Sequence, residues 1–124
     1  MPRVVHFDLP AEDPEKLKEF YEKVFEWKFD KWNDPSGQME YWLITTGKDE
    51  PGIDGGMAKR KSPDEQIANT IGVPNVDEYI TKVQENGGTI LMPKMPIPGV
   101  GWIASFKDPQ GNKHMIMQDD KDAK

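Results

Sequence analysis

Hydrophobic and polar residues alternate near the start of the chain, in the segment "RVVHFDL". In an extended backbone, Val5, Phe7 and Leu9 fall on one face. His6 and Asp8 fall on the other face. The alternation therefore predicts a strand with one apolar face and one mixed face.

The next segment, "EDPEKLKEFYEKVFEW", has its apolar residues at helical spacing instead. They are Leu17, Phe20, Tyr21, Val24 and Phe25. Asp13 stands at the position of an N-cap, and Pro14 stands at the first helical position, where proline is tolerated. These features predict a helix that begins at Pro14.

Three strands are expected after this helix. The segments "WKFDKW" and "MEYWLITT" are rich in aromatic and β-branched residues and form a strand pair around the turn "NDPSGQ". The segment "PGIDGGMAKR", which is broken by glycines, supplies the next strand.

The same order of elements returns after the polar connection "KSPDEQ". "IANTIGV" predicts a strand, and Asn75 caps the helix "VDEYITKVQENGG", with Glu78 at the capping-box position and Gly87 placed to end it. A short strand "TILMP" follows, then "KMPIPGVG", which is either a flap over a cavity or a Pro-stiffened loop. "WIASFKD" and "KHMIMQ" predict two strands around the turn "PQGN", and the tail "DDKDAK" is expected to be frayed.

The order is therefore strand, helix and three strands, written twice. It predicts an α+β fold with two βαβββ modules that form a curved mixed sheet around a cavity. We expect a single domain over residues 1–124, with a first module at about 3–60, a second at about 66–118 and a tail at 119–124.

Composition narrows the possible partners. The 124 residues carry a formal net charge of −6, which disfavours nucleic acid and anionic membranes as partners and leaves a small organic ligand as the expected one. Cysteine is absent, which excludes disulfides and thiolate metal sites. No apolar run is long enough to span a bilayer, and "MPRVVHFDLP" lacks the apolar core of a secretory signal, so we expect a cytoplasmic protein.

Three motifs together carry a resemblance to a known family. They are His6 followed by "EFYEKVFEW", then "VDEYITKVQENGGTILMP", and then "GWIASFKDPQGN". In these motifs the chain resembles the vicinal oxygen chelate superfamily, which includes glyoxalase I, bleomycin resistance proteins, fosfomycin resistance proteins and extradiol dioxygenases. The resemblance covers Val4 to Gln118 and implies a fold rather than one function, because this scaffold hosts many chemistries. It also implies a homodimer.

The resemblance implies four metal-ligand positions, with His or Gln on the first strand and Glu on the last strand of each module. His6 matches the first position. The corresponding position in the second half is Ala68, and the carboxylate expected after "DPQGN" falls on Met115. A thioether is a poor substitute for a carboxylate toward a hard divalent ion.

The remaining position falls in "GIDGGM", at Gly55, Gly56 or Met57, or at Asp54 if the register differs. One matched ligand of four predicts no metal site and no cofactor. We expect Met115 and Met117 to face the cavity and His114 to face away from it.

The candidate ligand-binding residues are His6, Asp8, Trp42, Thr70, Trp102, Met115 and Met117. His6 is the one candidate catalytic residue, as a polar anchor or general base, and a structural histidine bonded to the backbone or to Asp8 accounts for it equally well. Trp42 and Trp102 could form an aromatic platform, although core packing also accounts for them. The two methionines suggest a pliable apolar wall.

Two alternatives stay open. A register slip would turn His114 inward, where it and His6 could hold a metal with Asp8, Asp54 or Glu40, as in a metal-dependent lyase, isomerase or dioxygenase. A dimeric ferredoxin-like α/β barrel shares the same composition of sheet and two helices. The favoured hypothesis is a metal-free small-molecule-binding protein of the glyoxalase/bleomycin resistance type.

Overall fold

The structure is a computed structural model that describes residues 2–34, 37 and 40–124. Three positions of the expected turn "NDPSGQ", at 35, 36 and 38, lie outside the described residues. The chain divides into two compact units. The first unit is His6–Ile67, and the second unit is Met1–Val5 together with Ala68–Lys124.

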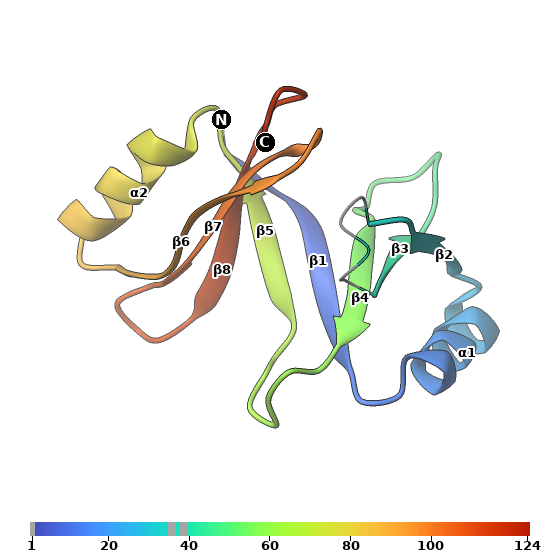
Figure 1. Ribbon diagram of the computed structural model, residues 1–124. Helices are drawn as coiled ribbons and strands as arrows, with labels where there is room; N and C mark the ends of the chain where they lie inside the picture. Colours follow the sequence, from blue (N-terminus) through green and yellow to red (C-terminus); the bar gives the residue numbers. More distant parts are fainter. Residues whose placement is uncertain (1, 35–36, 38–39) are drawn as a thin grey trace. The chain divides into compact units, whose positions relative to one another are not determined.

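The first unit is a βαβββ module (Figure 1). Its elements are β1 (Arg3–Ala11, from His6 onward), α1 (Pro14–Phe25), β2 (Lys28–Trp32), β3 (Tyr41–Thr45) and β4 (Gly55–Lys59). The strands lie in the order β2-β3-β4-β1, in which β4 and β1 are parallel and the other neighbours are antiparallel.

The second unit repeats this arrangement. Its elements are β5 (Ala68–Gly72), α2 (Val76–Glu85), β6 (Thr89–Ile97), β7 (Gly101–Lys107) and β8 (Lys113–Asp119). The strands lie in the order β5-β8-β7-β6, with β5 and β8 parallel. The first residues of β1 belong to this unit, where Val5 lies beside Gly72. The predicted α+β fold with two βαβββ modules is confirmed.

Both helices begin where the sequence predicts. The Asp13 carboxylate accepts a hydrogen bond from the N–H of Lys16, and the Asn75 side chain accepts one from the N–H of Glu78. These bonds satisfy N–H groups that a helix start leaves without intrahelical partners. Gly87 follows α2 with φ +91°, a left-handed conformation that suits glycine.

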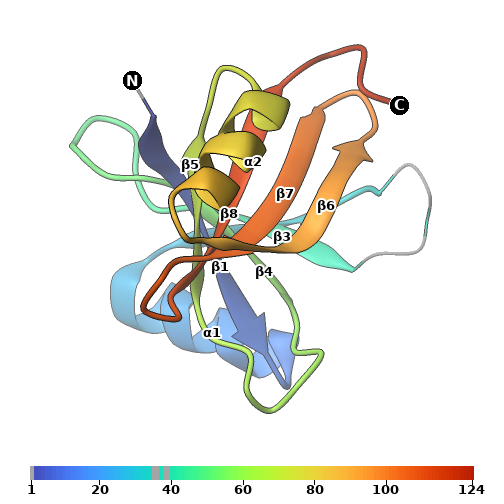
Figure 2. The same ribbon diagram turned by 90° about the vertical axis from the view of Figure 1, so that its left-hand side faces the viewer.

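Each helix covers one face of its own sheet, and each unit has its own apolar core. In the first unit, α1 contributes Leu17 and Tyr21 to a cluster built on Leu9, Ala11, Phe29, Trp42, Ile44 and Met57. In the second unit, α2 lies against β6, β7 and β8 (Figure 2) and contributes Tyr79 and Ile80 to a cluster built on Val73, Val76, Ala104 and Ile116. Strand alternation directs the remaining side chains of each unit to the sheet face opposite its helix.

Two expectations about the second unit were wrong. The predicted loop "KMPIPGVG" is largely strand, because β6 continues to Ile97 and pairs with β7 as far as Gly101. Proline is tolerated in β6 because β6 is the edge strand of the sheet order and one side of its backbone has no strand partner.

The tail is packed rather than frayed. Ala123 is only 4% exposed, and its carbonyl accepts a hydrogen bond from the N–H of Gly99. The N–H of Asp120 donates to the carbonyl of Val100. The tail therefore closes over the turn between β6 and β7.

Within the described residues, no helix is both long and apolar enough to cross a membrane.

Candidate functional site

A hydrogen-bonded polar cluster lies on the sheet face of the first unit that is opposite α1. Strand alternation puts Leu9 toward α1, and it puts His6 and Asp8 of β1 on the opposite face. In the same way, Trp42 and Ile44 of β3 lie in the core, and Tyr41 points to the polar face. The cluster therefore comes from two strands that β4 separates.

Tyr41 is the centre of this cluster. Its hydroxyl donates a hydrogen bond of 2.5 Å to Oδ1 of Asp8, and the same oxygen lies 2.8 Å from Nε2 of His6. Because a tyrosine hydroxyl has a single proton, its oxygen accepts from His6 Nε2–H. His6 Nε2 and Asp8 Oδ1 are 3.5 Å apart, so the three groups form one connected network.

Gly56 makes room for this network. A Cβ built on Gly56 would lie 1.7 Å from the Tyr41 hydroxyl oxygen and 2.1 Å from the ring carbon that carries it. No side-chain atom fits at that separation, so the Tyr41 phenol lies directly over the backbone of β4. Trp32 of β2 packs edge-on against the other side of Tyr41, with ring centroids 6.2 Å apart.

The environment keeps Tyr41 protonated. Burial, followed by the negative charge of Asp8, raises the pKa of the Tyr41 hydroxyl far above its ordinary value. At neutral pH the hydroxyl is therefore a hydrogen-bond donor. It is not a general base.

The second unit has an equivalent face with different chemistry. In the sheet register, Thr70 of β5 and Ser105 of β7 both lie beside Met115 of β8. Two register positions further along β8, Gly72 and Ile103 flank Met117 in the same way. The centre of this face is apolar apart from two hydroxyl groups, and Asp119 lies on the same face at the end of β8.

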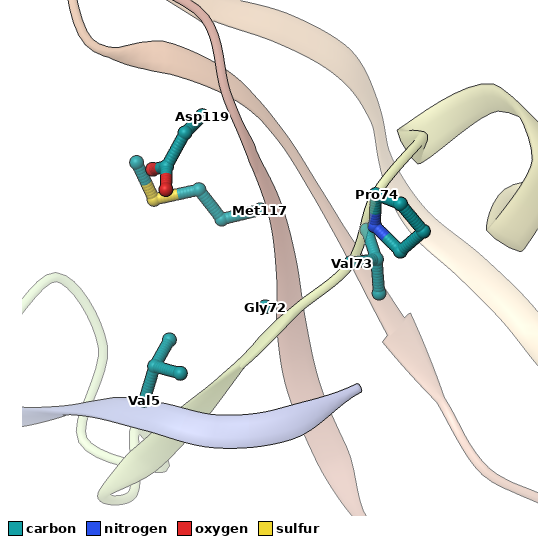
Figure 3. A pocket seen from close by; sticks show the side chains of 6 residues that line it. All are labelled: Val5, Gly72, Val73, Pro74, Met117 and Asp119. Carbon is teal, nitrogen blue, oxygen red and sulfur yellow. The ribbon is translucent and has the colours of Figure 1, made fainter. Parts of the chain in front are cut away.

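A pocket of about 370 Å³ opens beside Met117 in the second unit (Figure 3). It is lined by Val5, Gly72, Val73, Pro74, Met117 and Asp119. The Asp119 carboxylate lies near the thioether of Met117 in the close-up (Figure 3). Met117 is the one residue that this pocket shares with the ligand-binding candidates that the sequence suggested.

Comparisons with known proteins decide the family. The family model described as the Glyoxalase/Bleomycin resistance protein/Dioxygenase superfamily matches residues 3–116. The chain belongs to this superfamily. It is the family that the sequence motifs resemble.

Two curated relatives match this chain over only part of their own length. The chain is 31% identical over 113 residues to the protein named "Putative glyoxylase CFP32" in Mycobacterium tuberculosis and in Mycobacterium bovis. The match covers 84% of this chain and 41% of those proteins, so the chain spans about two fifths of their length.

Solved structures of low sequence identity share the fold. A hypothetical protein from Bacillus halodurans is similar with a TM-score of 0.72 and 18% identity, over 99% of this chain and 98% of that one. Methylmalonyl-CoA epimerase from Mycobacterium tuberculosis is similar with a TM-score of 0.71 and 8% identity, over 94% and 87%. At these identities the similarity concerns the fold alone.

The superfamily's metal ligands are not matched by the donors in the first unit. Nε2 of His6 is already engaged by the Tyr41 hydroxyl, which also donates to Asp8. Gly56 supplies no side chain, and its partner in the sheet register is Asp8. Asp54 is occupied elsewhere, because its carboxylate accepts hydrogen bonds from the backbone N–H and the hydroxyl of Thr46.

The second unit does not fit a divalent metal either. Met115 lies between the hydroxyl-bearing residues Thr70 and Ser105, and a hard divalent ion prefers carboxylates and imidazoles to thioethers. Across the part of the chain that the structure describes, no group of three His, Cys, Asp or Glu side chains is arranged to hold a metal. The donors described in the two units thus differ from the His and Glu set that the family resemblance implies.

His114 lies on the α2 side of its sheet. Its ring is 5.7 Å from the ring of Phe106, a residue of the second core, and Nδ1 is buried with no hydrogen-bond partner among the described residues. Glu40, another residue of the metal alternative, lies 3.9 Å from the Lys31 ammonium. Among the described residues, the contacts of His114 and Glu40 are thus with Phe106 and Lys31, and not with the residues of the polar cluster.

The two tryptophan candidates are core residues of their own units. Trp42 is 6% exposed beneath α1, on the face opposite His6. Trp102 packs on the core beside α2, with the Lys94 ammonium 4.5 Å from its ring centre, and its indole N–H donates to Asp120. The structure therefore does not bring either indole to the polar cluster or the pocket.

Sequence reasoning missed Tyr41, and it named Gly56 only as one possible ligand position on its strand. The alternation in "MEYWLITT" already puts Tyr41 on the face opposite Trp42 and Ile44, which marks its hydroxyl as a candidate for the polar face. The residues next to Tyr41 in the sequence do not indicate that its phenol lies over Gly56, because this contact is between two different strands.

Proposed function

We propose that this chain is a small-molecule-binding protein of the glyoxalase/bleomycin resistance type that works without a divalent metal. The observation that carries the proposal is the position of Tyr41. Its hydroxyl binds both His6 and Asp8, and its phenol fills the space over Gly56 where a ligand carboxylate would have to begin.

A side chain at position 56 and the present position of Tyr41 exclude each other. A glutamate at position 56 requires a Cβ, and that Cβ would overlap the Tyr41 hydroxyl at 1.7 Å. The first unit can therefore hold either Tyr41 in this position or a carboxylate on β4. The apolar pocket beside Met117 supports an organic ligand as the bound species.

Metal content and ligand binding test the proposal together. Untagged protein equilibrated with Zn²⁺, Ni²⁺, Mn²⁺ or Fe²⁺ and then desalted is expected to retain less than a stoichiometric amount by plasma mass spectrometry. A thermal-shift screen of small organic molecules is expected to give stabilising compounds, because a ligand that binds only the folded state raises its stability. Retention of one metal per chain would reject the proposal, whatever the ligand screen shows.

The second candidate is a metal-dependent lyase, isomerase or dioxygenase that uses His6. The observation in its favour is that His6 stands on β1 with the Asp8 carboxylate 3.5 Å away. Several solved proteins that share the fold are named as methylmalonyl-CoA epimerases. If this candidate is correct, a His6→Ala variant loses stoichiometric metal that the wild type retains.

We also propose a homodimer and a cytoplasmic location. The family resemblance supports the first, and the sequence pattern supports the second. Light scattering coupled to size exclusion tests the oligomeric state, and fractionation of the native host tests the location.

A further inference from the structure

We infer that the pocket beside Met117 binds a small organic cation, an ammonium group on an apolar body. The inference deepens the proposed function and rests on it, because it gives the class of organic ligand and the residues that would hold it. All the residues that line the pocket belong to the second unit.

The walls of the pocket are apolar. Val5, Val73, Pro74 and Met117 contribute hydrocarbon or thioether surface, and Gly72 leaves the floor without a side chain. A volume of about 370 Å³ lies at the lower end of the range for small-molecule sites. The flexible Met117 side chain can adapt to ligands of different shape. These walls favour a ligand whose buried part is compact and apolar.

The backbone around the pocket offers little to an anion. Helix α2 begins close by, and a helix start usually attracts anions through its exposed N–H groups. Here the Val76 N–H donates to the side-chain oxygen of Gln118, and the Glu78 N–H donates to Asn75. The Val73 N–H donates to the carbonyl of Met117, and Pro74 has no N–H. None of these four positions therefore offers a free N–H to a carboxylate or phosphate.

The one charged group that lines the pocket is Asp119. Among the described residues, its carboxylate has no hydrogen bond or ion pair, whereas the next residue, Asp120, is bonded to Trp102. An unpaired carboxylate at the edge of an apolar pocket attracts a cation that can also donate hydrogen bonds. The combination of apolar walls, occupied donors and a free carboxylate favours an ammonium ligand.

Benzylammonium, benzyl alcohol and benzoate form a matched set of probes. They share a ring and differ in charge at one end, so the comparison isolates the ionic contribution. Protein labelled with ¹³C at the methionine methyl groups reports binding, and a Met117→Leu variant identifies the Met117 signal. We expect a saturable shift of that signal with benzylammonium, a weaker response to benzyl alcohol and none with benzoate.

Two variants test the residues. Asp119→Asn keeps the shape and removes the charge, and it should weaken benzylammonium binding about fivefold, the effect of a largely exposed ion pair. Asp122→Asn is the matched control, because it makes the same change of net charge at an exposed position outside the pocket. Gly72→Val should abolish the Met117 response by filling the floor, since its Cβ would meet Val5 at an ordinary 3.4 Å. Gly52→Val, where a Cβ meets nothing within 4 Å, is its control.

The outcomes separate this inference from the proposed function. Tighter binding of benzoate than of benzylammonium would overturn the inference and leave the metal-free function standing. Equal binding of benzylammonium to the wild type and to Gly72→Val would also overturn the inference. Stoichiometric metal in the wild-type protein would overturn the proposed function, whatever the probes show at Met117.

Discussion

The Tyr41 hydroxyl occupies the space that any side chain on Gly56 would need. The two residues lie on neighbouring strands, β3 and β4, and a Cβ on Gly56 would be 1.7 Å from the hydroxyl oxygen. This complementarity couples the two positions, because a side chain at position 56 is accommodated only if Tyr41 moves or is replaced.

Gly56→Ala tests this coupling. We expect it to lower the free energy of unfolding by about 1–3 kcal/mol, as for other overpacked sites, because Tyr41 must move and leave His6 and Asp8. Gly47→Ala is the control, since a Cβ there meets nothing within 4 Å. Urea denaturation measures both. In a Tyr41→Ala background, Gly56→Ala should cost much less, and an unchanged cost would contradict the coupling.

A metal site should form when both positions change. In Tyr41→Ala combined with Gly56→Glu, the introduced carboxylate joins His6 and Asp8, and Nε2 of His6 loses its hydroxyl partner. Three such ligands suit Zn²⁺. Isothermal titration calorimetry should show one site per chain that the single variant Tyr41→Ala lacks. Adding His6→Ala should remove the site, and metal binding that survives this change would place the ion elsewhere.

The raised pKa of Tyr41 predicts a loss of stability at alkaline pH. The unfolded tyrosine ionises near pH 10, whereas the folded one keeps its proton, so the unfolded state binds fewer protons as the pH rises. The contribution of Tyr41 is therefore complete below about pH 10 and is lost above it, at up to about 1.4 kcal/mol per pH unit.

Urea unfolding of wild type and Tyr41→Phe between about pH 8 and pH 11 measures this contribution. Tyr41→Phe should be less stable near pH 8, because it lacks both hydrogen bonds, and its stability should fall less steeply with pH. Tyr79→Phe serves as the control, since no hydrogen bond to the Tyr79 hydroxyl occurs among the described residues. Parallel pH profiles for wild type and Tyr41→Phe would disprove the assignment.

The pKa of Asp120 should depend on Trp102. The indole hydrogen bond of 2.9 Å is the main cause that lowers the pKa of Asp120, followed by the backbone N–H of Asp122, and Lys94 contributes least. Trp102→Phe should therefore raise this pKa toward its ordinary value, as followed by the carboxyl ¹³C shift during an NMR titration. Lys94→Gln should raise it less. A larger effect of Lys94→Gln would show that charge, and not the indole, controls Asp120.

Local patterns in the sequence predicted most of the fold. The helix starts at Asp13 and Asn75 and the left-handed Gly87 depend on neighbouring residues, which a sequence displays directly. The extension of β6 to Ile97 could not be predicted from neighbouring residues. The prolines of β6 are tolerated because β6 is an edge strand, and which strand lies at the edge depends on the whole sheet.

The site was less predictable for a similar reason. His6 and Asp8 were found from strand alternation, whereas the contact of Tyr41 with Gly56 depends on the order and register of β3 and β4. The packing of Ala123 beside Gly99 is equally invisible in the polar tail sequence. Contacts between distant segments set these features, and hydrophobic patterning does not encode them residue by residue.

The division of β1 between the two units has a consequence for synthesis of the chain. All residues of the first unit, His6–Ile67, are synthesised before β5, so they leave the ribosome earlier than the second unit and can fold first. Arg3–Val5 must wait, because Val5 packs beside Gly72 in a unit that is made last. The amino-terminal residues are thus translated first and find their partners late, which makes their docking a slow, non-local step of folding.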